Sequence, residues 1–242
     1  MHNFLKENEV LDTLGIEDYK IIQHTKKYKF TSDAVLLANF AKIKKTHIVA
    51  DLCSGSGIVG ILCNIKYQPK HTYMVEMQEY MAEMSQRSIK MNNLKNITVI
   101  NKKIQEITEI QPETCDVITI NPPYKKAGIG AKNITEEIAL SRHEIEIDLT
   151  DIAKCSSKLL KFGGKLYMVH DANRLTEIIS TFKKHNLEVK KILLTYANIN
   201  NNANLVLIQA TKGGKSGVEV CPVLITNNAD GTYNHDLLKY IK

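Results

Sequence analysis

At residues 47–60 the sequence reads His47-Ile-Val-Ala-Asp51-Leu-Cys-Ser-Gly55-Ser-Gly57-Ile-Val-Gly60, and this stretch decides the expected fold. Its first half is apolar apart from His47 and Asp51 and predicts a buried strand, whereas the second half predicts a glycine turn and the start of a helix. Glycine lets the backbone pass close to a ligand, and the first turn of a helix presents free N–H groups. We therefore expect a ligand-binding turn between a strand and a helix.

Segments of strand and helix character alternate after this unit. Helices are expected at residues 58–66, 80–93, 149–161 and 175–185, and further strands at 72–76, 97–100, 116–120, 165–169, 189–196 and 204–211. This alternation is typical of a parallel sheet with helices on both faces, and the last two strands have no helix between them. The predicted fold class is α/β, Rossmann-like, with a seven-stranded mainly parallel sheet and an antiparallel edge hairpin.

The chain has 242 residues, of which 43% are hydrophobic and 24% charged, which suits one large domain. We expect an N-terminal extension over residues 1–46 packing on the core, a cofactor-binding domain over 47–214, and a C-terminal strand and short helix over 215–242 in the same domain. The longest apolar stretch, residues 48–65, is interrupted by Asp51 and the glycine turn, so no membrane span is expected.

Cysteine usage bears on the compartment and on metal binding. The five cysteines form no Cys-x-x-Cys pair and lie in apolar surroundings, which predicts reduced core residues in a cytoplasmic protein. Neither a disulfide framework nor a metal site is expected. The cysteines are Cys53, Cys63, Cys115, Cys155 and Cys221.

The glycine turn is compatible with three interpretations. The spacing of Gly55, Gly57 and Gly60 matches the dinucleotide fingerprint, with Glu76 at the end of the next strand as a ribose ligand. The turn also resembles the D/E-x-x-x-G-x-G loop of S-adenosylmethionine (SAM) methyltransferases, in which Asp51 would face a cationic cofactor. A carboxylate there would repel a pyrophosphate, so Asp51 favours SAM. The third interpretation is a turn without a ligand.

A second motif follows the strand at residues 116–120. Asn121-Pro122-Pro123-Tyr124 lies where doubly wound sheets bind ligands. It resembles the D/N-P-P-Y/F motif of enzymes that methylate adenine N6 or glutamine N5. The Asn121 amide oxygen and the Pro122 carbonyl can accept the N–H groups of the target amine, and Tyr124 can stack on a flat base. Positioning and fixed dipoles would supply the catalysis without a metal.

The resemblance extends over residues 12–214, almost the whole chain. Tyr28-x-Phe30-x-x-Asp33-x-x-Leu-Leu37, the glycine turn, the NPPY motif and Arg142-His143-Glu144 make the sequence similar to the bacterial tRNA adenine-N6 methyltransferases that act beside the anticodon, at adenine 37. This similarity implies the class I SAM-dependent methyltransferase fold, with SAM as cofactor and tRNA as substrate. The cofactor residues that it implies are Phe30, Thr31, Asp51, Cys53, Gly55, Gly57, Glu76, Met77, Lys103, Ile104 and Asn121.

One position departs from the family pattern. These enzymes usually carry an acidic residue after the third strand, near the cofactor adenine, whereas this chain has Asn101-Lys102-Lys103-Ile104. Lys103 stands at the corresponding position, so a backbone N–H would replace the acidic contact there.

Basic residues near the second motif are candidates for contact with RNA phosphates. The proposed RNA-binding residues are Lys125, Lys126, Lys132, Arg142 and His143, extended by Lys26, Lys27 and Lys29. A stacked adenine cannot reach a recessed pocket at a strand end, so the target must be unpaired or flipped, which favours a structured RNA loop over DNA.

The sequence therefore predicts a SAM-dependent tRNA (adenine-N6)-methyltransferase, acting as a monomer or weak homodimer. The NPPY motif alone does not distinguish it from a protein glutamine-N5 methyltransferase, although such enzymes usually have a larger, helical N-terminal domain than 46 residues allow. An NAD-dependent oxidoreductase would leave the NPPY motif unexplained. A non-catalytic RNA-binding protein is disfavoured by the intact set of Asp51, Gly55, Gly57 and Asn121.

Overall fold

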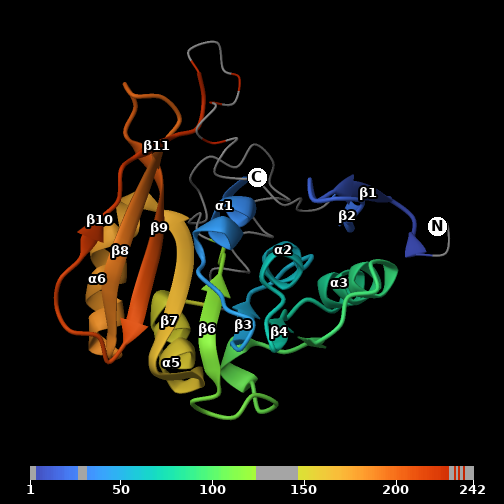
Figure 1. The fold of residues 1–242 in the computed structure, drawn as a ribbon, viewed down its shortest axis with the longest axis horizontal. Coiled ribbons are helices and arrows are strands. Elements are labelled where there is room, and N and C mark those ends of the chain that lie inside the picture. The colour runs from blue at the N-terminus through green and yellow to red at the C-terminus, as the bar shows by residue number, and fades with distance from the viewer. Residues whose placement is uncertain are drawn as a thin grey trace.

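The computed structural model describes residues 4–26, 32–123 and 147–228, together with residues 232, 234 and 237. A nine-stranded sheet crosses this part of the molecule in the order β10-β8-β9-β7-β6-β3-β4-β5, and β11 also pairs with β8 (Figure 1). The strands are β3 (Ile48–Leu52), β4 (His71–Val75), β5 (Ile97–Ile100), β6 (Cys115–Ile120), β7 (Leu160–Asp171), β8 (Leu187–Tyr196), β9 (Ala203–Lys212), β10 (Glu219–Val220) and β11 (Leu224–Ile225).

The predicted fold class is confirmed. Strands β3 to β7 pair in parallel, and β9 runs antiparallel to both β7 and β8, which gives the expected edge hairpin. The predicted count of seven strands is wrong, because β10 and β11 add two short strands beside β8. They come from one apolar run that Pro222 divides, since proline has no N–H to donate to a ladder.

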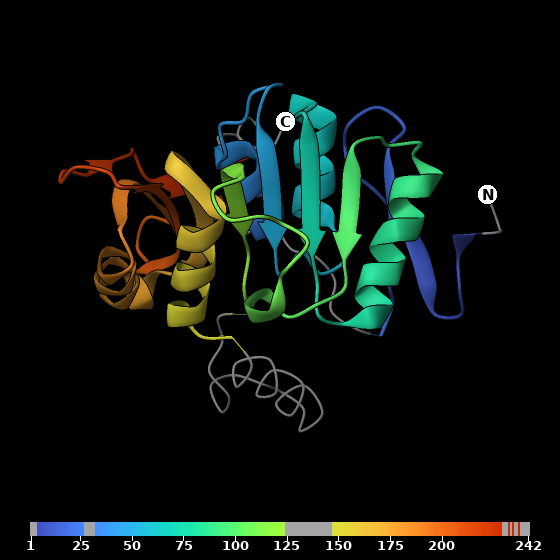
Figure 2. The ribbon, with the colours of Figure 1, turned by 90° about the horizontal axis from the view of Figure 1, so that it is seen from below.

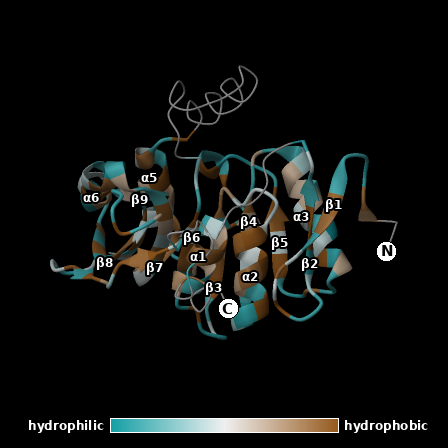
Figure 3. Ribbon diagram, turned by 90° about the horizontal axis from the view of Figure 1, so that it is seen from above, coloured by the Kyte–Doolittle hydropathy of each residue, from teal (hydrophilic) through white to brown (hydrophobic). Residues whose placement is uncertain are grey.

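Helices cover both faces of the sheet (Figure 2). On one face α1 (Ser32–Phe40) and α2 (Ile58–Tyr67) enclose a hydrophobic core, and on the other α5 (Leu149–Leu159) and α6 (Leu175–Lys184) enclose a second. The strands and the helix surfaces that face them are the most apolar parts of the molecule (Figure 3). None of the helices in the described ranges is long and apolar enough to cross a membrane.

The junction between α5 and β7 differs from the sequence prediction. The sequence predicts a helix over residues 149–161 and a strand from residue 165, but the helix ends at Leu159 and the strand begins at Leu160. Gly163 lies within the strand at φ +77, a left-handed conformation that glycine adopts without strain. The register with β6 shifts here, so the two glycines form a bulge and do not stop the helix.

An N-terminal hairpin lies outside the main sheet. Strands β1 (Glu9–Thr13) and β2 (Lys20–His24) pair with each other, and β2 contacts α3 (Glu79–Met91) near β5. The Ser88 hydroxyl accepts the backbone N–H of Ile22 at 3.0 Å, and Arg87 makes an ion pair with Glu9 at 2.6 Å. The division into 1–46, 47–214 and 215–242 stays a prediction.

Candidate active site

The candidate site lies at the carboxyl ends of three neighbouring strands. Leu52 of β3 pairs with Val75 of β4 on one side and with Ile120 of β6 on the other. The chain crosses from β3 to β4 on one side and later returns to form β6 on the other, so β3 lies at a topological switch point. Ligands of doubly wound sheets bind at such a point. The glycine turn, Glu76 and Asn121 follow these three strands directly.

The three glycines of the turn have different surroundings. A Cβ atom on Gly57, whose φ is +90, would approach Met74 Cε to 2.4 Å, and one on Gly60 would approach Met74 Cγ to 2.7 Å. Gly57 suits its left-handed backbone conformation, and the absence of a side chain at Gly60 lets α2 pack closely on Met74 of β4. A Cβ atom on Gly55 would meet nothing within 4 Å. Gly55 thus borders open space, which is where the sequence analysis places a cofactor.

Asp51 lies beneath this turn and is 1% exposed. Its Oδ2 accepts the backbone N–H of Gly60 at 2.9 Å, and its Oδ1 accepts the hydroxyl of Thr119 at 2.7 Å. Burial raises the pKa of Asp51 to about 7; the two hydrogen bonds lower it and the Glu76 carboxylate raises it further. The carboxylate joins β3, β6 and α2 and places a titrating group below the turn.

Glu76 is also buried and connects two loops. Its carboxylate accepts the backbone N–H of Gly55 at 2.8 Å and that of Gln78 at 2.9 Å. The side chain of Asn101 donates to the carbonyls of Glu76, at 2.8 Å, and of Met77, at 3.1 Å. These bonds hold the glycine turn, the end of β4 and the end of β5 together as one surface.

Asn121 follows the last residue of β6 and is partly exposed, while Pro122 next to it is buried. The Asn121 side-chain amide makes no hydrogen bond with any residue that the structure describes. A polar amide that has no partner among the described residues, in a proline-rigidified turn at the edge of a binding site, is suited to bind a substrate.

Other predicted cofactor residues lie directly before the turn and after β5. Cys53 directly precedes it, at φ +55, and is partly buried. Lys103 caps a short 3-10 helix, η2 (Ile104–Glu106), after β5. The Ile104 carbonyl accepts the Cys155 thiol at 3.3 Å, and Ile104 lines a groove of about 240 Å³ between η2 and α5. Its carbonyl is therefore engaged by the protein itself.

Several predicted site residues lie outside the described residues, and Lys26 lies in the turn after β2. Those outside are Phe30 and Thr31 of the cofactor set, Tyr124 of the motif, and Lys27, Lys29, Lys125, Lys126, Lys132, Arg142 and His143 of the RNA set.

Two residues that the sequence analysis did not assign also belong to this region. Thr119 is fully buried and bonds Asp51, and Ser54 Oγ is buried without a hydrogen-bond partner in the described part of the chain. The polar Thr119 between two isoleucines of an expected buried strand could have indicated a buried hydrogen bond. Its partner could not be predicted, because the partner depends on the strand register. Ser54 had no signal beyond its place in the turn.

The observed residues fit SAM. Open space beside Gly55 leaves room for a ligand close to the backbone, and Ser54 Oγ in the same turn has no hydrogen-bond partner among the described residues. The carboxylates of Asp51 and Glu76 suit a sulfonium cation and would repel a pyrophosphate. The fold and the site together define a SAM-dependent methyltransferase, as the sequence predicted.

Comparison with known proteins gives the family. The family described as "Methyltransferase small domain" matches residues 30–192, so the chain belongs to this family. A relative from Haemophilus influenzae (strain PittEE), named tRNA1(Val) (adenine(37)-N6)-methyltransferase, is 28% identical over 75% of this chain and 82% of its own length. A relative of the same name from Aeromonas hydrophila is 25% identical over 85% of each chain. The resemblance inferred from the motifs is thereby confirmed.

Solved structures agree with the fold. A predicted O-methyltransferase from Agrobacterium tumefaciens superposes with a TM-score of 0.68 at 20% identity, covering 86% of this chain and 96% of the other. At this identity the likeness shows the fold. The predicted enzyme class is confirmed by the family, and the oxidoreductase alternative is not supported.

Proposed function

We propose that this protein transfers a methyl group from SAM to N6 of an unpaired adenine in a tRNA anticodon loop, at adenine 37. The observation that carries the proposal is the Asn121 amide: it is partly exposed, has no partner among the described residues, and lies one strand away from the glycine turn. An exocyclic adenine amine is a weak nucleophile, so the protein must orient it more than activate it.

Asn121 and the rigid turn after it carry out this orientation. The Asn121 side-chain oxygen accepts one N–H of the amine and the Pro122 carbonyl accepts the other, while Pro123 limits the turn and Tyr124 stacks on the base. The two acceptors favour a tetrahedral nitrogen whose lone pair points at the donor, and this interaction strengthens in the transition state. SAM supplies the electrophilic methyl group when bound, and no metal takes part.

The cofactor is held by the residues around the turn. Glu76 accepts the ribose hydroxyls, since its carboxylate lies at the end of β4 beside the glycine turn, where it bonds the backbone N–H groups of Gly55 and Gln78. Asp51 provides negative charge beneath the cation. The other cofactor residues of the proposal are Cys53, Gly55, Gly57, Met77, the backbone at Lys103 and Ile104, and Phe30 and Thr31.

The choice of tRNA rests on the names of the relatives and on the chemistry of the target. An anticodon loop presents unstacked bases that an aromatic side chain can bind. In this proposal contacts to phosphates come from Lys125, Lys126, Lys132, Arg142 and His143, and also from Lys26, Lys27 and Lys29. In this proposal the protein acts in the cytoplasm as a monomer or weak homodimer.

One experiment tests the proposal. Purified protein is incubated with methyl-labelled SAM and total tRNA that lacks the modification, and the labelled nucleoside is identified and mapped. We expect N6-methyladenine at position 37. Label in another nucleoside, or in protein and not in RNA, would contradict the proposal; transcripts with adenine 37 replaced by guanine provide the matched substrate control.

A further inference from the structure

Thr119 is the residue with the clearest unassigned contact in the site region. It lies on β6, is fully buried, and faces Asp51 of β3 directly in the strand register. Its hydroxyl donates to Asp51 Oδ1 at 2.7 Å, a normal length for an O–H···O hydrogen bond. Sixty-eight residues separate the two in the sequence.

The contact links the two halves of the site. Asp51 Oδ2 receives the N–H of Gly60 in the first turns of α2, so Thr119 and Gly60 fix both oxygens of one carboxylate. Thr119 also comes two residues before Asn121 on the same strand. Removing the Thr119 hydroxyl would therefore change the orientation and the charge of the Asp51 carboxylate first. The glycine turn would be affected second, through the bond between Asp51 and Gly60.

We propose that Thr119 is a positioning residue that keeps the buried Asp51 carboxylate ionised and oriented, and thereby sets the pH range over which the protein binds its cofactor. This inference rests on the proposed function, because it takes the ligand to be the SAM cation. Ionised Asp51 attracts that cation, whereas protonated Asp51 does not. At a pH where Asp51 is protonated in the free protein, cofactor binding is then coupled to release of that proton to solvent.

The surroundings of Asp51 make its hydrogen bonds decisive. Burial raises its pKa to about 7, and the Thr119 hydroxyl is the largest influence that lowers it. The ionisable groups that face it are the Glu76 carboxylate after β4, the Cys53 thiol after β3 and the Cys63 thiol on α2. Burial raises the pKa of both thiols, so they stay neutral near pH 7. No lysine or arginine in the described residues forms an ion pair with Asp51.

Binding of SAM, measured by calorimetry without RNA, tests the inference. The variants are Thr119→Val, which keeps the shape and removes the donor, and Thr119→Ser, which keeps the donor. Thr72→Val is the matched control, because Thr72 is equally buried on neighbouring β4 and contacts Asn64. Titrations run from about pH 5 to about pH 9, which spans the expected midpoint.

We expect wild-type affinity to rise with pH and level off above about pH 7. In Thr119→Val the midpoint moves up by about one pH unit or more, with roughly tenfold weaker binding at neutral pH, since a hydrogen bond to a charged group is lost. Thr119→Ser and Thr72→Val follow the wild-type profile. Ionisation of the SAM amino group is common to all four proteins and cancels in the comparison.

A double-mutant cycle separates positioning from general loosening. In the Asp51→Asn background, Thr119→Val should leave the pH profile unchanged, because the titrating group is gone. A Thr119→Val profile that coincides with wild type overturns the inference, as does an equal shift in Thr72→Val or in the Asp51→Asn background. Absence of SAM binding in the wild-type protein would instead contradict the proposed function.

Discussion

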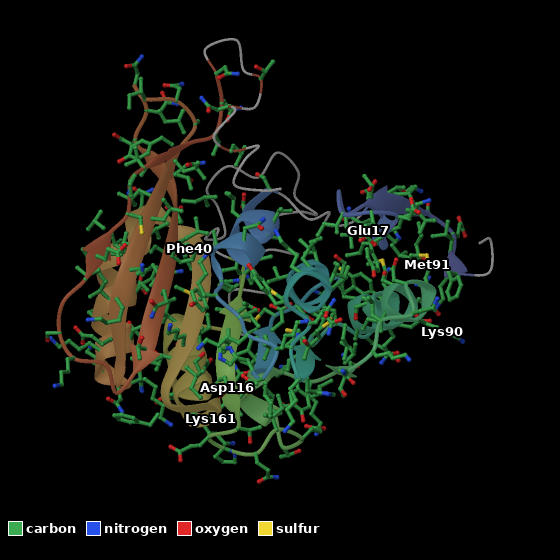
Figure 4. The ribbon with its side chains drawn as sticks, viewed as in Figure 1. Glu17, Phe40, Lys90, Met91, Asp116 and Lys161 are labelled. Atoms are coloured by element: carbon green, nitrogen blue, oxygen red, sulfur yellow. The ribbon has the colours of Figure 1, made fainter. Side chains whose placement is uncertain are left out.

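Asp51 and Asp116 occupy opposite ends of two neighbouring strands in one sheet, and their environments differ in kind. Asp51 lies near the carboxyl end of β3, is 1% exposed, and receives a hydroxyl and a backbone N–H. Asp116 lies at the amino end of β6, close to Lys161 (Figure 4). Its carboxylate accepts a hydrogen bond from the Lys161 ammonium at 2.7 Å and one from the backbone N–H of Ile48 at 2.8 Å. Both tie β3 to its surroundings.

The difference appears in the charge that each site favours. Burial dominates at Asp51 and raises its pKa to about 7. At Asp116 burial would also raise the pKa, but the bonds from Lys161 and Ile48 and the charges of Lys161 and His47 outweigh it, and the pKa is lowered. A carboxylate with a cation partner stabilises the fold, whereas one kept without a cation in a buried position is typical of a functional site.

Replacing Asp51 by Asn should give the largest effect. The raised pKa means that Asp51 favours folding below the unfolded pKa of about 4, and this contribution is lost as pH rises through about 7. An Asn side chain can accept the Gly60 N–H with its amide oxygen and donate to the Thr119 hydroxyl oxygen with its NH₂ group. Relative to wild type, Asp51→Asn should therefore gain stability between acid and neutral pH, by about 4 kcal/mol at most.

Denaturant unfolding of both proteins without cofactor, at about pH 4 and about pH 8, measures this difference. Subtracting the variant's free energy of unfolding from that of the wild type at each pH removes the contribution of the other titrating groups. If the free energies of unfolding of the two proteins depended on pH in the same way, the pKa of Asp51 would not be raised, and the contrast with Asp116 would be wrong.

The Asn121→Ala change tests whether the carboxyl end of the sheet is the catalytic end. Turnover should fall by roughly 100- to 1000-fold, about 2.7–4 kcal/mol, because a preorganised acceptor for the target amine is lost. SAM affinity should change little, since this acceptor acts mainly in the transition state. Single-turnover methylation of tRNA measures the rate, and a folded, SAM-binding variant with near wild-type turnover would contradict the NPPY assignment.

Glu76→Ala should weaken SAM binding by about 1–3 kcal/mol, because ribose hydroxyls and the N–H groups of Gly55 and Gln78 lose their acceptor. Glu76→Gln keeps the shape and one acceptor and should have a smaller effect. Calorimetric titration distinguishes them; unchanged affinity in Glu76→Ala would remove Glu76 from the cofactor site.

Asp116→Asn should show the opposite pH behaviour to Asp51→Asn. A lowered pKa means that Asp116 contributes stability above the unfolded pKa of about 4, and that this contribution disappears as the pH falls. We expect the variant to be less stable by about 1–2 kcal/mol at neutral pH, after allowance for partial exposure, and equal to wild type in strong acid. Urea unfolding measures this, and unchanged SAM affinity would keep Asp116 separate from the site.

Lys161→Met should have the smallest effect. The Lys161 side chain is 45% exposed, so its ion pair with Asp116 is screened by solvent and worth about 1 kcal/mol or less. Molar salt should remove the difference from wild type in thermal unfolding. A larger, salt-independent loss would show that the stem of Lys161 contributes by packing.

Much of the fold could be predicted because apolar runs such as residues 116–120 leave few alternatives to a buried strand. The prediction failed where backbone geometry depended on a neighbour. At Gly163-Gly164 the glycines were compatible with a helix end, but pairing of Leu160 with Cys115 draws the chain into the sheet first. In the same way, β10 and β11 form because the two halves of one apolar run, divided by Pro222, can pair with the edge of β8.

For the site, the sequence alone predicts the chemistry, because the glycine turn, the acidic residues at 51 and 76, and Asn121 with its prolines are local patterns. Tertiary structure decided which of these groups meet and what charge they carry. Thr119 reaches Asp51 because β6 pairs with β3 in one register, and a shift by one residue would turn it to the other face. The raised pKa of Asp51 likewise arises from desolvation by α2 and the neighbouring strands, which no local pattern contains.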